Sequence, residues 1–240
     1  MYRIQKKSSY FFVTLVVCFL VLLGTSTMQG FCEDSAEGSP TSRSEQSLSL
    51  DEIISKVEER YAVPGFSVQF FQEAILKAID ITDTGAGQIF IKRPGMMRWE
   101  YEKPERQIII TDGRDLWIYR QEDNQVMVGK APSFFGDGKG AGFLSDMTLI
   151  RKQFFILPGE TNHKDYYQIK LLPKEKTPDI ASVNLLISKK TFEVVQVITF
   201  NAYGDETRIT MHNFQVHPDL DSSLFSFTVP DGADIVQLDE

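Results

Sequence analysis

The pattern of hydrophobic and polar positions repeats first with the period of a helix and then with the period of a strand. Ser49 and Glu52 stand at capping-box spacing, and the apolar residues that follow recur at helical spacing: Leu50, Ile53, Ile54, Val57 and Tyr61. Pro64 and Gly65 end this segment. The pattern predicts a helix with one apolar face, which must lie on an apolar surface.

From Phe66 onward the period is two, as in a half-buried strand, because Phe66, Val68 and Phe70 alternate with polar neighbours. Further strands are predicted at residues 74–82, 87–92, 96–101, 107–111, 115–120, 125–129, 166–172, 181–188, 194–200, 208–216 and 226–229. About ten strands in succession with almost no helix between them predict a mainly β (α+β) chain with one large antiparallel sheet. A twisted sheet of that size curls into a barrel or half-barrel.

Residues 131–157 interrupt this series of strands. Four glycines between positions 136 and 142 lead into a short amphipathic helix, whose apolar residues are Phe143, Leu144, Met147, Leu149 and Ile150. Such a long insertion in a compact domain usually has a function. Together with the first helix, it offers two apolar faces that would cover the open side of the curled sheet.

The first 32 residues have the three parts of a secretory signal peptide: a basic head, an apolar run from residue 10 to 23, and small residues after it. That run is short for a membrane span, which needs roughly 20 apolar residues. Cleavage after Ser26, Thr27 or Cys32 remains open. Residues 33–47 hold one alanine and no larger apolar side chain, which predicts a flexible linker before a domain at 48–240.

Charge and cysteine content narrow the function further. The formal charge is −8, and removal of Arg3, Lys6 and Lys7 with the signal makes the mature chain more acidic. An acidic domain is a poor partner for nucleic acid or anionic lipid. Of the two cysteines, Cys18 leaves with the signal. Cys32 follows the bulky Phe31, which argues against lipid attachment there. We therefore expect no internal disulfide.

The sequence offers no group of residues for catalysis, a metal or a cofactor. The three histidines lack metal-ligand spacing, and no Gly-x-Ser-x-Gly motif is present. The glycine-rich run at 136–140 lacks the Lys-Ser/Thr end of a phosphate-binding loop. Glu100 and Glu102 share one face of a predicted strand and are interpreted as solvated. We expect a binding protein and not an enzyme.

Several motifs from Gly87 to Val128 occur in an order that identifies a family. They are Gly87 to Pro94 (GQIFIKRP), Arg98 to Tyr101 (RWEY), Pro104, Thr111 to Gly113 (TDG), Leu116 to Tyr119 (LWIY) and Gln125-Val126, followed by Phe225 to Gly232 (FSFTVPDG). This arrangement resembles the periplasmic outer-membrane lipoprotein carrier family, LolA. The resemblance extends over essentially everything from about Leu48 onward, and it is specific between Gly87 and Val128.

The resemblance implies an unclosed antiparallel β-barrel, covered by a lid of short helices, that takes up the acyl chains of lipoproteins. It implies a periplasmic protein that receives acylated lipoproteins from an inner-membrane lipoprotein-releasing ABC transporter and passes them to an outer-membrane acceptor. We expect a monomer without nucleic-acid partners. The alternatives are a general lipid-binding or lipoprotein-sensing module of the same fold, and a lipid-processing enzyme, for which nucleophile and base are missing.

By the same resemblance, Arg93 and Pro94 form a lid latch, in which Arg93 binds backbone carbonyls of the lid. An arginine suits this role because its five donors are held in a fixed fork. The alternative is a rim arginine paired with Glu100. Candidate residues for the acyl-chain cavity and its lid, for each of which plain core packing is the alternative, are Val57, Tyr61, Phe70, Phe90, Trp99, Trp117, Phe143, Leu144, Leu149 and Ile150. In the empty carrier, the lid's apolar face would occupy the cavity and compete with cargo.

Overall fold

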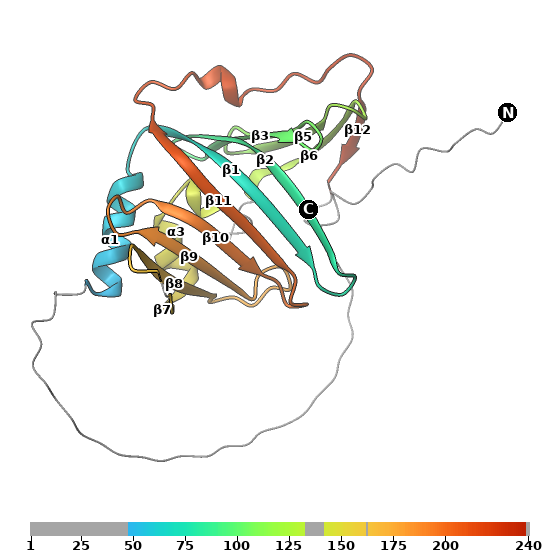
Figure 1. Cartoon of the computed structure of the whole chain (residues 1–240). Coiled ribbons are helices and arrows are strands. Elements are labelled where there is room, and N and C mark those ends of the chain that lie inside the picture. The colour runs from blue at the N-terminus through green and yellow to red at the C-terminus, as the bar shows by residue number, and fades with distance from the viewer. Residues whose placement is uncertain (1–47, 133–141, 162, 239–240) are drawn as a thin grey trace, which may run out of the picture. The chain divides into compact units, whose positions relative to one another are not determined.

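The computed structural model describes residues 48–132, 142–161 and 163–238. The predicted signal peptide, the linker and most of the glycine-rich lead-in lie outside these residues. The first element of the described part is helix α1 (Leu50–Tyr61), and strands β1 to β6 follow it (Figure 1). These strands are β1 (Gly65–Leu76), β2 (Ile81–Lys92), β3 (Met96–Lys103), β4 (Gln107–Thr111), β5 (Asp115–Arg120) and β6 (Gln125–Lys130).

Short helices separate this half of the sheet from the next. They are the 3-10 helix η2 (Gly142–Leu144) and α3 (Thr148–Gln153). The remaining elements are β7 (Phe154–Pro158), β8 (Tyr166–Pro173), β9 (Ser182–Ser188), β10 (Val194–Phe200), β11 (Glu206–Val216), the 3-10 helix η3 (Ser222–Phe225) and β12 (Asp234–Gln237).

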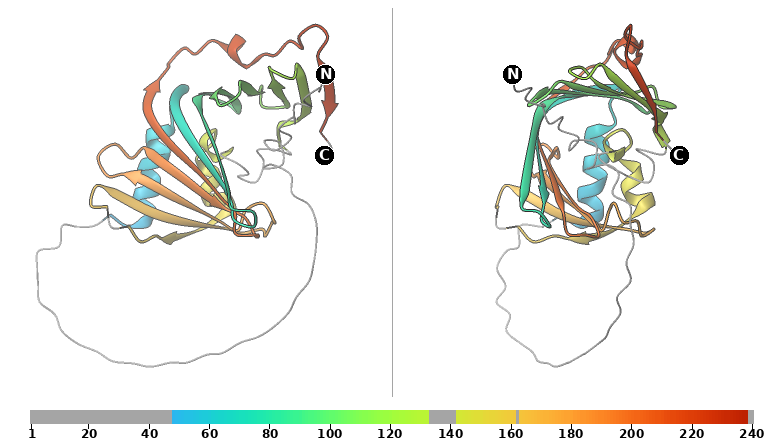
Figure 2. Two further views of the ribbon diagram at one scale, coloured as in Figure 1. Left: turned by 45° about the vertical axis from the view of Figure 1, so that its right-hand side comes forward. Right: turned by 90° about the vertical axis from the view of Figure 1, so that its right-hand side faces the viewer.

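All twelve strands belong to one sheet, in the order β12-β6-β5-β4-β3-β2-β1-β11-β10-β9-β8-β7. Neighbouring strands are antiparallel except for β12 and β6, which are parallel. The sheet is not closed, because β12 and β7 are its two edges. It curves around α1 and the segment that contains α3 (Figure 2). The predicted large, curled, unclosed sheet with short helices is confirmed, with one parallel pair that the prediction of a purely antiparallel sheet lacked.

Three strand predictions were wrong in detail. Residues 74–82 do not form one strand, because a turn at 77–80 separates β1 from β2, with Asp80 at a positive φ of 52°. Residues 83–86, which lay between the predicted strands 74–82 and 87–92, are inside β2. Residues 226–229 are irregular, and the last strand is instead β12. β7 was not predicted, since most of its residues lie in the segment 131–157, which was interpreted as an interruption between strands.

The core lies between the concave face of the sheet and the helices. Ile53, Ile54, Val57 and Tyr61 project from α1 and are buried. Both halves of the sheet also contribute buried apolar side chains, among them Phe66, Phe70, Ile89, Met97, Leu116, Ile169, Leu171, Val183, Leu185 and Ile187. This burial explains why a helix with so marked an apolar face forms here.

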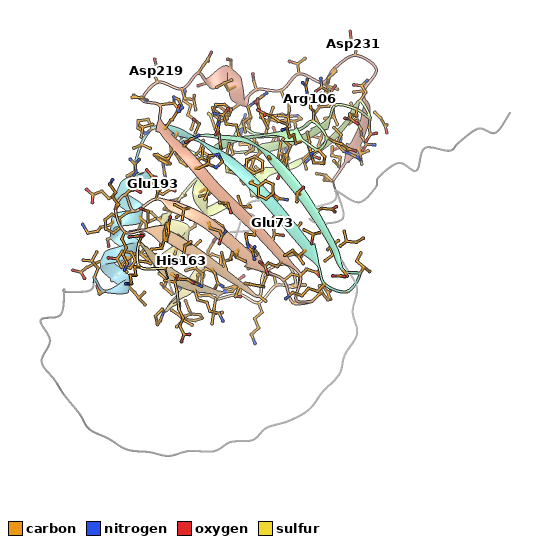
Figure 3. All side chains as sticks on the ribbon, viewed as in Figure 1. Glu73, Arg106, His163, Glu193, Asp219 and Asp231 are labelled. Carbon is orange, nitrogen blue, oxygen red and sulfur yellow. The ribbon has the colours of Figure 1, made fainter. Side chains whose placement is uncertain are left out.

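The convex face of β2 to β6 is covered by the segment 217–233. Figure 3 labels Asp219 and Asp231 near its two ends. Lys92 Nζ donates to the carbonyl oxygen of Leu220 at 2.6 Å, and Arg98 Nη1 donates to that of Leu224 at 3.0 Å. Phe225 is 1% exposed, so this segment supplies a second, smaller apolar layer. β2 to β6 are therefore covered on both faces.

Candidate functional site

An aromatic cluster lies on the concave face where β1, β2 and β3 meet. The ring of Phe70 stands 5.2 Å from that of Trp99 and 4.9 Å from that of Tyr101, both edge to face. Tyr101 Oη donates to Gln72 Oε1 at 3.0 Å, and burial raises the pKa of the Tyr101 phenol. Trp99 is 5% exposed. The cluster is apolar apart from these few polar groups, as lipid-binding sites are.

Two glycines allow the strands to approach closely at this cluster. A Cβ on Gly87 would lie 1.8 Å from the carbonyl oxygen of Glu100, so β3 leaves no room for a side chain there. A Cβ on Gly85 would lie 3.1 Å from the ring of Tyr101. The register shifts between Ala86 and Gly87, which is a bulge. The ring of Tyr101 therefore packs directly over the backbone of β2 at Gly85.

Phe90 and Trp117 do not join this cluster. Trp99 is opposite Ile89 and Ile109, whereas Trp117 is opposite Ile110. Because side chains alternate between the two faces of a sheet, Trp117 and Phe90 lie on the convex face. There the ring of Trp117 is 6.3 Å from that of Phe227 in the C-terminal segment. The structure thus brings Phe70 and Trp99 together and separates them from Phe90 and Trp117.

The predicted lid residues on α1 are in the core. Val57 is fully buried, and Tyr61 is 1% exposed. The Tyr61 ring stands 5.2 Å from the rings of both Phe66 and Phe214. Its hydroxyl oxygen accepts a hydrogen bond of 3.1 Å from the backbone N–H of Val194, and burial raises the pKa of the phenol. The C-terminal end of α1 therefore contacts both halves of the sheet.

The second predicted lid segment is also in the core. Phe143, Leu144 and Ile150 are fully buried, and Leu149 is half-buried. The predicted single helix is divided into η2 and α3 by residues 145–147, where Asp146 Oδ1 accepts from the backbone N–H of Thr148 at 3.0 Å. Two short helices therefore lie inside the curve of the sheet (Figure 2).

Arg93 joins the end of β2 to the end of α1. Its Nε and Nη2 donate to the carbonyl oxygen of Tyr61 at 3.1 Å and 2.8 Å. Partial burial lowers the pKa of Arg93, and the nearby charge of Asp146 opposes this shift. Glu100, the alternative partner, binds Arg98 instead. Pro94 is exposed, and the Arg93–Pro94 peptide bond is cis.

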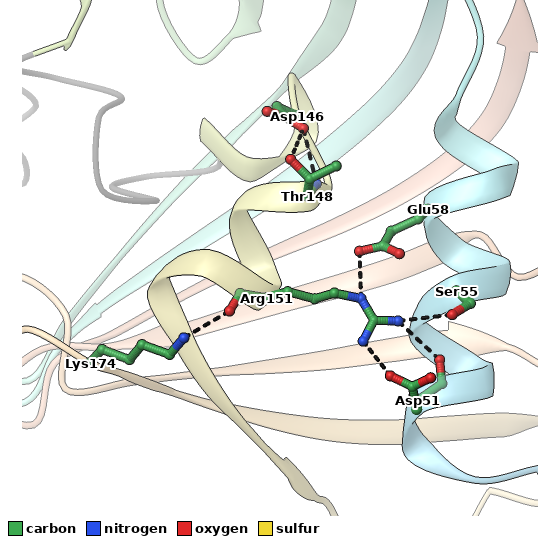
Figure 4. A network of polar contacts seen from close by, with 7 residues as sticks. All are labelled: Asp51, Ser55, Glu58, Asp146, Thr148, Arg151 and Lys174. Carbon is green, nitrogen blue, oxygen red and sulfur yellow. Dashed lines mark hydrogen bonds and ion pairs between the residues drawn. The ribbon is translucent and has the colours of Figure 1, made fainter.

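Arg151 joins α3 to α1 and was not predicted from the sequence. Its Nε donates to Glu58 Oε1 at 2.9 Å and its Nη2 donates to Ser55 Oγ at 2.8 Å, while the guanidinium also binds the carboxylate and the carbonyl of Asp51 (Figure 4). These three α1 residues are spaced four and three apart, so they share one polar face of the helix. The spacing of these three polar residues was the only feature of the sequence that could have indicated a polar contact on this face of α1.

The described side chains do not form catalytic or metal-binding machinery. Ser67 Oγ lies 2.8 Å from His217 Nε2, but Ser67 is 1% exposed, and this pair has no carboxylate partner in the part of the chain that the structure describes. Among the described residues, no group of three or more His, Cys, Asp or Glu side chains is arranged to hold a metal ion. Within that same part of the chain, no helix has the length and apolarity to cross a membrane.

Comparison with known proteins gives a consistent answer. Residues 62–228 match the family model described as "Outer membrane lipoprotein carrier protein LolA". An outer-membrane lipoprotein carrier protein of Cupriavidus taiwanensis is 30% identical over 159 residues, which are 66% of this chain and 74% of the relative. One from Cupriavidus pinatubonensis is 29% identical over 160 residues, or 67% and 74% of the two chains.

Among solved structures, an uncharacterized conserved protein from Thermus thermophilus matches with a TM-score of 0.51 at 14% identity. The match covers 78% of this chain and 98% of that one. A likeness at this identity shows a shared fold and carries no information on the ligand.

Proposed function

Since the chain belongs to the LolA family of outer membrane lipoprotein carrier proteins, a family of non-enzymatic transport proteins, we propose that it binds the acyl chains of lipoproteins between the concave face of its sheet and the helices α1 and α3. The observation that carries this proposal is that helices α1 and α3 cover the concave face of the sheet. Two short helices bury their apolar side chains against it, yet arginine contacts hold them to the sheet and to each other. Helices held in this way can be displaced by an apolar ligand.

The energetics favour such an exchange. Each acyl methylene moved out of water contributes about 0.8 kcal/mol, so a free lipoprotein would aggregate or stay in its membrane. The buried side chains of α1 and η2 already occupy the apolar face, including Val57, Phe143 and Leu144. An acyl chain must displace these apolar contacts before it can bind. The net affinity is therefore the difference between the free energy gained by burying the acyl chain and the free energy lost by exposing the helix side chains. Uptake therefore stays reversible.

Arg93 acts in this proposal as the lid latch, together with the turn at Pro94. Its two hydrogen bonds to the Tyr61 carbonyl form when α1 lies on the sheet, and opening of α1 breaks them. Arg151 makes α1 and α3 move together, because its guanidinium contacts three residues of α1. The closed state thus gains polar contacts that the open state lacks, which favours release of the cargo.

Family membership implies a periplasmic location. We propose that residues 1–32 form the signal peptide, that 33–47 form a linker, and that the carrier domain starts at residue 48. We propose further that the cargo comes from an inner-membrane lipoprotein-releasing ABC transporter and goes to an outer-membrane acceptor, and that the carrier works as a monomer. The acidic composition supports a carrier that does not itself adhere to anionic membranes.

Native mass spectrometry of the mature protein tests this function. The protein is purified from the periplasm after co-expression with an acylated lipoprotein, and in parallel with the same lipoprotein whose acylated cysteine is replaced by alanine. A one-to-one complex with the first partner and none with the second is the expected result. Co-purification of free lipid in both preparations, without lipoprotein, would instead favour the general lipid-binding module.

A further inference from the structure

The indole N–H of Trp99 is a buried hydrogen-bond donor without a partner. Trp99 is 5% exposed, and its Nε1 has no acceptor among the residues that the structure describes. Tryptophan has a single donor and no acceptor. The side chain is therefore left wholly unsatisfied, unlike Arg208, whose other nitrogens bind Glu73 and Glu206. An unpaired buried donor loses its hydrogen bonds to water without compensation, so its presence calls for an explanation.

The surroundings show where an acceptor would come from. Trp99 lies in the aromatic cluster of the concave face, with Phe70 packed against its ring. The neighbouring polar group in this cluster, the hydroxyl of Tyr101, is already bonded to Gln72. Trp99 thus presents the free donor of the cluster, on the face where the helices meet the sheet. A ligand that replaces the helices would meet this N–H.

We propose that Trp99 is a specificity-determining residue, whose indole N–H donates a hydrogen bond to an ester carbonyl of the bound acylglyceryl group. This inference rests on the proposed function, since it requires acyl chains on the concave face. The donor-only indole selects an acceptor, and the strong acceptor next to an acyl chain is the carbonyl that links it to glycerol. The hydrocarbon itself offers none. The bond distinguishes acyl esters from other hydrocarbon chains and fixes the depth of insertion.

The test compares two synthetic ligands on the mature protein. One is a short peptide that carries a diacylglyceryl-modified cysteine, and the other is its dialkyl ether analogue with the same chain length but no ester carbonyl. Competition binding measured by native mass spectrometry avoids dependence on tryptophan fluorescence. We expect the wild-type protein to prefer the ester by about fivefold, which corresponds to one net hydrogen bond.

The variant Trp99→Phe removes the N–H and keeps an aromatic ring. It should bind both ligands equally. Its thermal unfolding midpoint should fall only by the amount expected for replacing a buried indole with a smaller ring. The matched control, Trp117→Phe, alters the other face of the sheet and should keep the preference for the ester. A second readout uses the 15N-labelled indole of Trp99 in the wild-type protein, whose N–H proton resonance should move further downfield with the ester ligand than with the ether.

Equal binding of both ligands by the wild-type protein would overturn the role of Trp99 and leave the carrier function standing. The same holds if Trp99→Phe keeps the full preference. Failure of the wild-type protein to bind either ligand would overturn the proposed function itself, and with it this inference.

Discussion

Two hydrogen bonds from the Arg93 guanidinium converge on a single oxygen, the carbonyl of Tyr61 at the last residue of α1. The last carbonyls of a helix have no partner within the helix. Arg93 satisfies one of them with charge-assisted bonds and also ties α1 to the end of β2. Tyr61 contributes both the carbonyl that Arg93 binds and a ring that packs in the core. The polar and apolar contacts between this end of α1 and the sheet therefore form and break together.

Replacement of Arg93 by leucine should give a protein that folds and accepts lipid but releases it poorly. The closed state loses a bond to a charged group, which contributes about 1.5 to 3 kcal/mol, while the open state loses nothing. The measurement is the rate at which a labelled lipopeptide leaves the preloaded protein for acceptor vesicles. Arg114→Leu is the control, since that side chain is 86% exposed. Release at the normal rate by Arg93→Leu would refute the latch.

Replacement of Arg151 by alanine should uncouple α1 from α3. The partly exposed ion pairs to Asp51 and Glu58 each contribute up to about 1 kcal/mol, so overall stability should fall only modestly. Hydrogen exchange in α1 should accelerate by more than that in β9 and β10. Arg151→Lys is the control, because a lysine keeps the charge but not the fork that reaches Ser55 and Glu58 together. Unchanged exchange in α1 would show that the helices are coupled by apolar packing alone.

Replacement of Tyr61 by phenylalanine should destabilise the protein by about 1 to 3 kcal/mol. The variant keeps the ring but leaves the buried N–H of Val194 without its acceptor. Urea unfolding measures the difference in the free energy of unfolding. Tyr119→Phe provides the comparison, since its hydroxyl makes a longer contact of 3.3 Å with Asn124 near the surface. Equal effects of the two substitutions would mean that Val194 finds another acceptor.

Replacement of Gly87 by alanine should disrupt the strand pair β2–β3. The new Cβ would lie 1.8 Å from the carbonyl oxygen of Glu100, so the backbone of one strand must move. The loss in the free energy of unfolding should therefore be roughly 3 kcal/mol or more, above the range of about 1 to 3 kcal/mol that is typical of overpacking. Gly85→Ala should cost less, because its Cβ would lie 3.1 Å from a ring that can shift. Thermal unfolding ranks the two variants. A mild effect of Gly87→Ala would mean that the strand pair adjusts readily at the register shift between Ala86 and Gly87.

Features that depend on local sequence pattern were predicted, whereas features that depend on contacts between distant segments were missed. Its capping box and apolar spacing predicted α1, and Pro64 and Gly65 marked its end. The apolar run Ile108-Ile109-Ile110 shows no alternation, because β4 is covered on both faces. The face of Trp117 relative to Trp99 was therefore not readable, and the cover supplied by residues 217–233 is a long-range contact. Arg151 was missed for the same reason, since its partners precede it by more than 90 residues.

The two faces of the sheet should behave differently toward cargo. A photoreactive phenylalanine analogue at position 70 lies on the concave face and should crosslink to an acylated lipoprotein. The same analogue at position 117 faces the C-terminal segment, where the Phe227 ring stands 6.3 Å from that of Trp117, and it should not crosslink. The unacylated lipoprotein controls for contacts of the protein part, and should crosslink at neither position. A product at position 117 as strong as that at 70 would mean that the segment 217–233 opens as well, and would move the acyl chains to the convex face.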